Sequence, residues 1–388
     1  MAQPTDPSFV PPNPDALGDE ASVSGLEVVG ALPPELSGCL LGIGPGHSET
    51  GSPGTGDGVV HSVHLHAGRA LGYRRRRVRT DPVANRLGIE RPTGLPPARR
   101  TGVADSIVVF SGSTLALGDS SLAYELSLDL DTLRRVDLAG HSRGLTATPK
   151  LDPATGDLHL IAAETDGAQA HVVVSSGALT RRSRPILDPP HRVADLAITR
   201  DSVVFIASGF IGITSHDTQT PIRWIATGVD AGLVAAHDAG EAVVVYTVTP
   251  SLERWTVDVP QATIHREILD ASPRRLARAN EHVSDEAPRF LWAVGDGTLH
   301  TYDLATGGHA QHNFGSRQPG DLTFIADATR PNESAGGWLV GFVEGPAGAT
   351  VDLVFLDAAD IERLPIATVG LPPGTSRGLH TTWVPSSR

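Results

Sequence analysis

The stretch Gly295-Asp-Gly-Thr-Leu-His-Thr-Tyr-Asp-Leu-Ala-Thr-Gly307 contains one short strand-forming run between two turns. The Asp-Gly dipeptide at 296–297 precedes the run, and Ala-Thr-Gly-Gly at 305–308 follows it. Tight turns favour both sequences, because glycine adopts positive φ without steric cost. Strand and turn in this order are typical of an outer hairpin in a blade of a β-propeller.

The same arrangement recurs along most of the chain. Short β-branched or apolar runs alternate with turn sequences in groups of about 40 to 50 residues, as propeller blades do. The runs that we predict as strands are 106–111, 115–117, 158–163, 171–175, 202–208, 242–248, 290–294, 299–304, 338–343 and 351–356. Helical windows are scarce, and only Pro273–Glu281 is predicted as a short helix. The pattern favours an all-β propeller, with a β-sandwich as the competing architecture.

The domain organisation follows from the absence of any linker in the middle of the 388-residue chain. A chain of this length suffices for one large all-β domain. Residues 1–24 are expected to form an extended N-terminal leader, and residues 25–388 a single propeller domain.

The bulk composition excludes several classes of partner. A net charge of −13 argues against nucleic-acid binding, and the run Arg74–Arg77 is interpreted as a solvated outer strand whose alternate side chains point to opposite faces. No stretch approaches the roughly 20 consecutive apolar residues that span a bilayer. Met1–Asp19 lacks the basic and apolar regions of a secretory signal, and Cys39 is the single cysteine. We expect a soluble cytoplasmic protein without stable membrane insertion.

A second group of motifs lies in a fixed order along the chain. The first is Thr146-Ala-Thr-Pro-Lys-Leu-Asp-Pro-Ala-Thr-Gly-Asp157, and others are Leu26–Gly38, Gly56–His61, Gly337–Val343 and Leu379–Val384. Together they resemble the carotenoid cleavage oxygenase family, also called the retinal pigment epithelium membrane protein family. The resemblance covers nearly the whole chain. It implies a seven-bladed β-propeller with a loop cap over an axial cavity that holds the active site.

The resemblance also implies four histidines around a ferrous ion, and here the chain departs from the family. The four ligand positions correspond to Thr148, Ala194, Gly232 and His380, so that one imidazole of four remains. Neutral imidazole suits iron, whereas the three replacements do not bind it. Fe²⁺ is the cofactor that the family implies, but we predict no metal and no other cofactor.

The residues that orient the ligands in the family have changed as well. Asp119 stands where the family has Glu, and Ala271 stands where the family has a carboxylate that this chain lacks. Because a buried carboxylate without a partner is costly, the loss at 271 is consistent with the loss of the histidine that it would orient. Asp321 is retained as a carboxylate and is expected to hold His380.

Other histidines give weaker signals. His61, His64 and His66 are close in sequence, and 64 and 66 would share a strand face, but we interpret them as exposed outer-strand residues. His309 and His312 flank a predicted turn and are weaker candidates still.

Three functions remain open. The first is a metal-independent enzyme that cyclises or isomerises an elongated polyene, polyketide or terpenoid, with His380 as acid–base group, Asp321 as its orienter, and Thr148, Ala194, Gly232 and Asp119 around an enlarged substrate pocket. His380 is equally well explained as a buried histidine of the scaffold. The second is an iron-dependent carotenoid or apocarotenoid cleavage dioxygenase with an atypical site. The third is a non-catalytic binder of a small apolar molecule.

Overall fold

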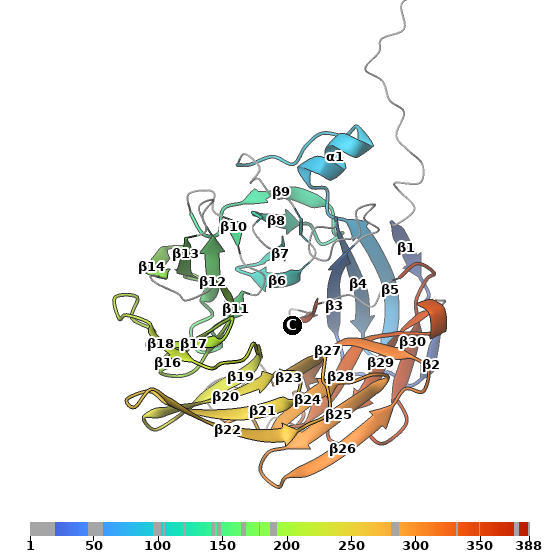
Figure 1. Ribbon diagram of the computed structural model, residues 1–388. Helices are drawn as coiled ribbons and strands as arrows, with labels where there is room; N and C mark the ends of the chain where they lie inside the picture. The colour runs from blue at the N-terminus through green and yellow to red at the C-terminus, as the bar shows by residue number, and fades with distance from the viewer. Residues whose placement is uncertain are drawn as a thin grey trace, which may run out of the picture.

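The computed structural model describes residues 20–45, 57–95, 102–103, 105–118, 121–140, 144–145, 149–163, 168–177, 179–186, 192–280, 287–330, 333–348, 350–375 and 380–386. These residues form seven antiparallel sheets arranged around a central axis (Figure 1). The seven-bladed β-propeller expected from the sequence is confirmed.

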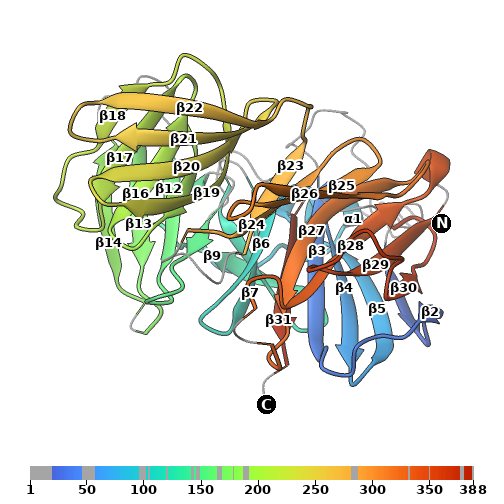
Figure 2. The same ribbon diagram turned by 90° about the horizontal axis from the view of Figure 1, so that it is seen from below.

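The first blade combines the two ends of the described chain. From its outer edge to the axis it contains β1 (Ala21–Ser24), β5 (Arg69–Arg77), β4 (Gly58–His66), β3 (Gly38–Pro45) and β31 (His380–Pro385). The C-terminal strand β31 pairs with β3 from Gly38↔Pro385 to Ile43↔His380, which closes the ring (Figure 2). The strand β1 lies within the predicted leader and pairs with β5, whereas residues 1–19 are outside the described part of the chain.

The other six blades follow in chain order, each with its first strand nearest the axis. The second contains β6 (Ser106–Phe110), β7 (Ser113–Leu117), β8 (Ala123–Leu126) and β9 (Thr132–Val136). The third contains β10 (Gly144–Leu145), β11 (Lys150–Leu151), β12 (Leu158–Ala163), β13 (Gln169–Val174) and β14 (Arg181–Ile186). The fourth contains β15 (Val193–Ile198), β16 (Ser202–Ala207), β17 (Phe210–Ser215) and β18 (Arg223–Ala226).

The last three blades complete the ring. The fifth contains β19 (Gly232–Ala239), β20 (Ala242–Val248), β21 (Leu252–Asp258) and β22 (Thr263–Asp270). The sixth contains β23 (Leu276–Ala279), β24 (Phe290–Val294), β25 (Thr298–Asp303) and β26 (Gly308–Asn313). The seventh contains β27 (Gln318–Ala326), β28 (Gly337–Glu344), β29 (Val351–Asp357), β30 (Ala367–Gly370) and β2 (Val28–Gly30). Each of the ten predicted runs falls on one of these strands.

The predicted helix over Pro273–Glu281 is wrong. Leu276–Ala279 forms β23, which pairs with β24, so that the sheet decides its conformation. The described α-helix is instead α1 (Asp81–Leu87), with proline in its first turn and Gly88 in the left-handed conformation (φ 66°) at its end. None of the described helices has the length and apolar composition to span a bilayer.

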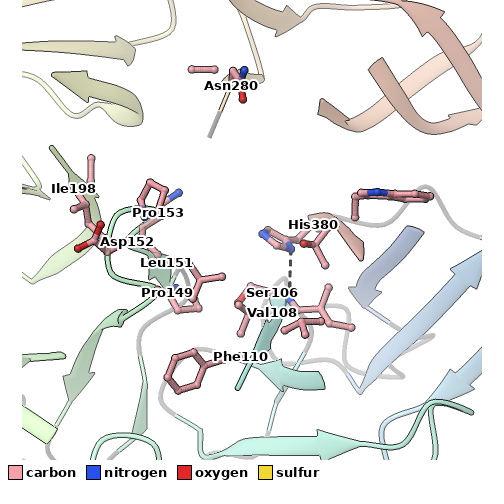
Figure 3. Close-up of a pocket in the computed structure, with 18 of the residues that line it drawn as sticks. Ser106, Val108, Phe110, Pro149, Leu151, Asp152, Pro153, Ile198, Asn280 and His380 are labelled. Carbon is pink, nitrogen blue, oxygen red and sulfur yellow. Dashed lines mark hydrogen bonds between the residues drawn. The ribbon is translucent and has the colours of Figure 1, made fainter. Parts of the chain in front are cut away.

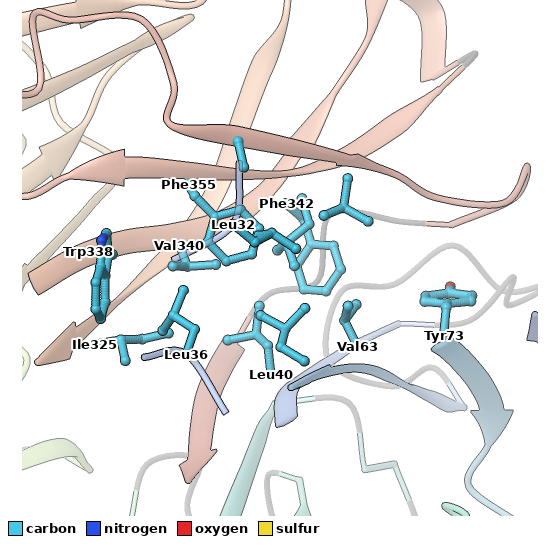
Figure 4. Packing of buried hydrophobic residues seen from close by; sticks show 14 of the residues in the cluster. Leu32, Leu36, Leu40, Val63, Tyr73, Ile325, Trp338, Val340, Phe342 and Phe355 are labelled. Atoms are coloured by element: carbon cyan, nitrogen blue, oxygen red, sulfur yellow. The ribbon is translucent and has the colours of Figure 1, made fainter. Parts of the chain in front are cut away.

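The hydrophobic core is divided among the seven interfaces between neighbouring blades. In the interface that closes the ring, Leu40 and Val63 of the first blade pack against Val340, Phe342 and Phe355 of the seventh (Figure 4). Comparable clusters of buried side chains lie between each of the other adjacent pairs. Each blade is therefore stabilised by burying one face against each neighbour.

The arginine run on β5 partly departs from the solvated strand that we expected. The side chains do alternate between faces, but Arg75 and Arg77 are buried, at 5% and 8% exposure. Arg77 donates to the carboxylate of Asp57, and Arg76 donates to the backbone carbonyl of Ala21 and so holds β1. Arg74 instead pairs with Asp129, which lies between β8 and β9 in the second blade, so the run has partners both within its own blade and in the next one.

The closing interface can be tested by truncating Phe355. Phe355 is fully buried, so that Phe355→Ala removes apolar contacts and leaves a cavity. We expect the free energy of unfolding in urea to fall by about 3–5 kcal/mol. Leu364→Ala is the control, because Leu364 is 88% exposed and its truncation removes little buried surface. Equal effects of the two substitutions would contradict this account of the core.

The acid stability of the first blade depends on His61. Burial, and secondarily the charge of Arg75, lowers the pKa of His61 to about 3, while its Nδ1 lies 2.8 Å from the hydroxyl of Tyr73. The unfolded chain takes up a proton at this residue below about pH 6.5, whereas the folded chain does not. Stability is therefore lost as the pH falls from about 6.5 toward 3.

We expect His61→Gln to reduce the slope of unfolding free energy against pH in that range by up to about 1.4 kcal/mol per pH unit. This is the slope that the uptake of one proton on unfolding produces. The measurement is urea denaturation at a series of pH values. His66→Gln is the control, since His66 is exposed at the end of β4. An unchanged slope in His61→Gln would show that this residue is protonated in the folded state.

Candidate functional site

A cavity of about 710 Å³ lies where the first strands of the blades converge. Its walls come from six of the seven blades, and the residues labelled in Figure 3 show two facing sides. Leu151 and Asp152 lie on one side, and Ser106 and His380 lie on the other. The volume is in the range of natural binding sites for small molecules.

The described lining is mainly apolar, with a few polar side chains. The apolar contributors include Val108, Phe110, Leu151, Ile198, Val234 and Trp383. The polar contributors include Lys150, Asp152, Asn280 and His380. Such a lining binds an apolar body and fixes its orientation through a few hydrogen bonds.

His380 is the first residue of β31 and is half-buried in the cavity wall. Its Nδ1 accepts a hydrogen bond from the backbone N–H of Ile107 at 3.4 Å. A neutral imidazole that accepts at Nδ1 carries its proton on Nε2. His380 is therefore placed as a hydrogen-bond donor through Nε2.

Asp321 lies on β27 and is 3% exposed. Its carboxylate accepts from Nε of Arg278 at 2.8 Å and from Nη2 of the same guanidinium. It also accepts from the backbone N–H of Thr381 at 3.1 Å and from the Thr381 hydroxyl at 3.3 Å. Asp321 thus contacts the residue that follows His380, and its connection to the imidazole runs through the backbone of β31.

The other predicted site residues do not lie in the described wall of the cavity. Ala194 lies in the bulge of β15 and Gly232 begins β19; both are exposed, and neither is among the described residues that line the cavity. Their strands contribute Ile198 and Val234 to the wall instead, because these residues lie further along β15 and β19. Thr148 and Asp119 fall outside the described residues.

The described positions do not fit a centre of four imidazoles. Of the three that the structure describes, only His380 carries a nitrogen ligand, since alanine and glycine have none. No reaction step is therefore assigned to an iron ion bound there.

Two other groups of potential metal ligands are present among the described residues. Asp152, His159 and His216 each offer a ligand atom, and these atoms lie within 4.8 Å of one another. Asp270, His300 and His309 form a similar group. Sequence inspection missed both groups, because their members come from separate strands and turns and have no local motif.

The histidines that sequence analysis singled out have other environments. His61 is buried rather than exposed, His64 Nε2 lies 3.8 Å from the sulfur of Cys39, and His66 is exposed. His309 and His312 lie on the same strand, β26, so that no turn separates them. His309 belongs to the second metal-ligand group, whereas Nδ1 of His312 contacts the carbonyl of Ile361.

Comparisons with known proteins agree with this architecture. The family model described as retinal pigment epithelial membrane protein matches residues 16–224 and 226–385. A carotenoid cleavage oxygenase of Mycobacterium tuberculosis is 26% identical over 494 aligned positions, which cover 96% of each chain. Isoeugenol monooxygenase of Pseudomonas nitroreducens is 24% identical and covers 94% of this chain and 95% of its own.

The solved structure of cobalt-substituted Synechocystis apocarotenoid oxygenase has the same fold. It superimposes with a TM-score of 0.84 at 18% identity, with 97% of each chain covered.

These findings correct the expectation of a protein without any cofactor. A metal is bound in a solved structure of this fold, and the described part of the chain itself contains two groups of His and Asp side chains that could hold one. The expectation rested on the three missing histidines of the axial site and on other histidines judged singly, and it did not include these two groups. By the extent of the family match, this chain belongs to the retinal pigment epithelial membrane protein family of carotenoid cleavage oxygenases.

Proposed function

We propose that the protein is an oxygenase that cleaves a conjugated carbon–carbon double bond in an elongated apolar molecule. The observation that carries the proposal is the axial cavity of about 710 Å³, with an apolar lining and His380 in its wall. The relatives named for carotenoid, isoeugenol and resveratrol substrates support it, because all three compounds contain a double bond in conjugation. A family name alone would not suffice, since one fold serves many reactions.

The lining determines how such a substrate would be held. Phe110, Leu151 and Ile198 provide apolar surface for a polyene or styrene-like body. Nε2 of His380 and the amide of Asn280 provide hydrogen bonds for a hydroxyl or carbonyl group at the end of the molecule. The apolar walls also exclude water from the bond that reacts.

The overall reaction uses O₂ as the second substrate. One oxygen atom is added to each carbon of the double bond, the carbon–carbon bond is broken, and two carbonyl products form. The atoms and electrons balance without a further reductant.

Cyclisation or isomerisation is the second candidate, and one observation favours it. His380 is the sole imidazole among the described axial positions, and an imidazole in a cavity wall is a group that acid–base catalysis uses. Such a reaction would rearrange the substrate without consuming O₂.

An assay under isotopically labelled oxygen distinguishes the candidates. We expect purified protein supplied with an apocarotenal, a stilbene and a phenylpropenoid to convert at least one of them to two carbonyl products with ¹⁸O from ¹⁸O₂. The products are identified by mass spectrometry, with a parallel reaction under nitrogen. We expect His380→Ala to lower kcat/KM by at least about tenfold, whereas the exposed control His66→Ala retains activity.

If an isomer forms equally well under nitrogen, the protein is a cyclase or isomerase and not a cleavage oxygenase. If all three compounds bind tightly and none is converted, the protein is a non-catalytic binder of apolar molecules.

We further propose that Asp321 and Arg278 position His380 through Thr381. Removing the guanidinium in Arg278→Ala leaves a buried carboxylate without its main partner, and we expect a loss of about 3–5 kcal/mol in unfolding free energy. The control Arg254→Ala breaks an exposed pair with Glu267 and should cost at most about 1 kcal/mol. The double substitution Arg278→Met with Asp321→Leu should recover part of the stability, because Thr381 still loses its acceptor, but not kcat. Full recovery of kcat would contradict the positioning role.

A further inference from the structure

Three potential metal ligands meet at the interface between the third and fourth blades. Asp152 lies in the turn after β11, His159 lies on β12, and His216 directly follows β17. Asp152 and His159 are buried, at 6% and 3% exposure, and His216 is half-buried. Three separate segments of the chain therefore contribute one donor each, within 4.8 Å of one another.

The two imidazoles are each oriented by a contact of one ring nitrogen. Nε2 of His216 lies 2.9 Å from the backbone carbonyl of Thr199, so that it carries the proton and Nδ1 keeps the lone pair. Nδ1 of His159 lies 3.2 Å from Nε2 of His171, which leaves Nε2 of His159 as its ligating nitrogen. Metal-bound histidines in proteins have this arrangement, in which the second nitrogen is fixed by a hydrogen bond.

The carboxylate of Asp152 is held in the same way. Its Oδ1 accepts from the backbone N–H of Ala154 at 2.9 Å, and its Oδ2 accepts from the hydroxyl of Thr155 at 2.8 Å. Each oxygen keeps a further lone pair for a ligand. The side chain is thus ordered by hydrogen-bond donors from the turn that contains it.

The charge of the group suits a metal ion. A neutral imidazole has a lone pair to donate to a cation, and the carboxylate of Asp152 adds negative charge to the group. The nearby guanidinium of Arg182 pairs with Asp157 at 3.2 Å. In the second group, by contrast, Arg274 pairs directly with Asp270, which makes that group a poorer cation site.

We propose that Asp152, His159 and His216 bind a divalent first-row transition metal such as Fe²⁺, Co²⁺ or Zn²⁺. Two imidazoles and one carboxylate are a ligand set that these ions accept, and they leave coordination positions open for water or another ligand. The site is distinct from the axial position of His380. It joins two blades that also meet through apolar packing and through hydrogen bonds of Gln169 and Arg184.

The position of the site links it to the axial cavity. Asp152 is also part of the cavity wall, where it lies on the side opposite His380 (Figure 3). A metal bound to Asp152 and His216 would fix the turn after β11 against the fourth blade. The wall that contains Leu151 and Pro153 would be fixed with it.

Cobalt titration of tag-free, metal-stripped protein tests the proposal. We expect one equivalent of Co²⁺ to bind, with the visible absorption of a low-symmetry cobalt site. Asp152→Ala and His216→Gln should each weaken binding by more than about 100-fold, because each removes a ligand rather than an outer contact. His309→Gln, in the second group, should bind cobalt as the wild type does.

The variants are compared only when their near-ultraviolet circular dichroism matches the wild type, and His216, which is half-buried, is the substitution that perturbs packing least. Absence of stoichiometric cobalt binding in the wild type would overturn the proposal. Equal affinity in Asp152→Ala, His216→Gln and the wild type would overturn it as well. The outcome is independent of the proposed oxygenase activity, since cobalt binding without substrate cleavage contradicts only that activity.

Discussion

The pairing of β31 with β3 is the contact on which the rest of the structure depends. It makes the last strand of the chain the innermost strand of the first blade, and so closes the ring of seven sheets. The same pairing sets His380 opposite Ile43 and brings its ring to the axial cavity. Asp321 and Thr323 of the seventh blade reinforce the closure, because both hydrogen-bond Thr381.

The closed ring contains two regions that can hold functional groups, the axial cavity and the interfaces between blades. The first strands of the blades enclose the cavity, where side chains can be varied without loss of the sheets. The interfaces between blades are mostly apolar, so that a cluster of polar side chains within one of them is a distinct feature. Asp152, His159 and His216 are such a group, and Asp152 belongs to both places.

Much of the fold could be predicted from the sequence. β12, β20 and β24 coincide with predicted runs, because strands bounded by Gly, Pro and Asp turns leave a local signal. The helix at 273–281 was wrong, since pairing with β24 outweighs the local helical pattern there. The true helix α1 has its own signals in the proline of its first turn and in Gly88, but it is short.

The candidate site was harder to predict from the sequence than the fold was. His380 could be placed in the cavity because its motif is local and lies at the start of one strand. The group around His159 could not, because it depends on the register of β12 with β13 and on the packing of the fourth blade against the third. Similarly, Arg278 emerges as the partner of Asp321 only when β23 and β27 are placed side by side.

We propose that a metal in this protein binds in the wall between the third and fourth blades and not on the axis. Anomalous diffraction from crystals of the cobalt-loaded protein, recorded on both sides of the cobalt absorption edge, tests it most directly. We expect one strong peak within bonding distance of Asp152, His159 and His216. A peak beside His380 with none at the blade interface would contradict the claim.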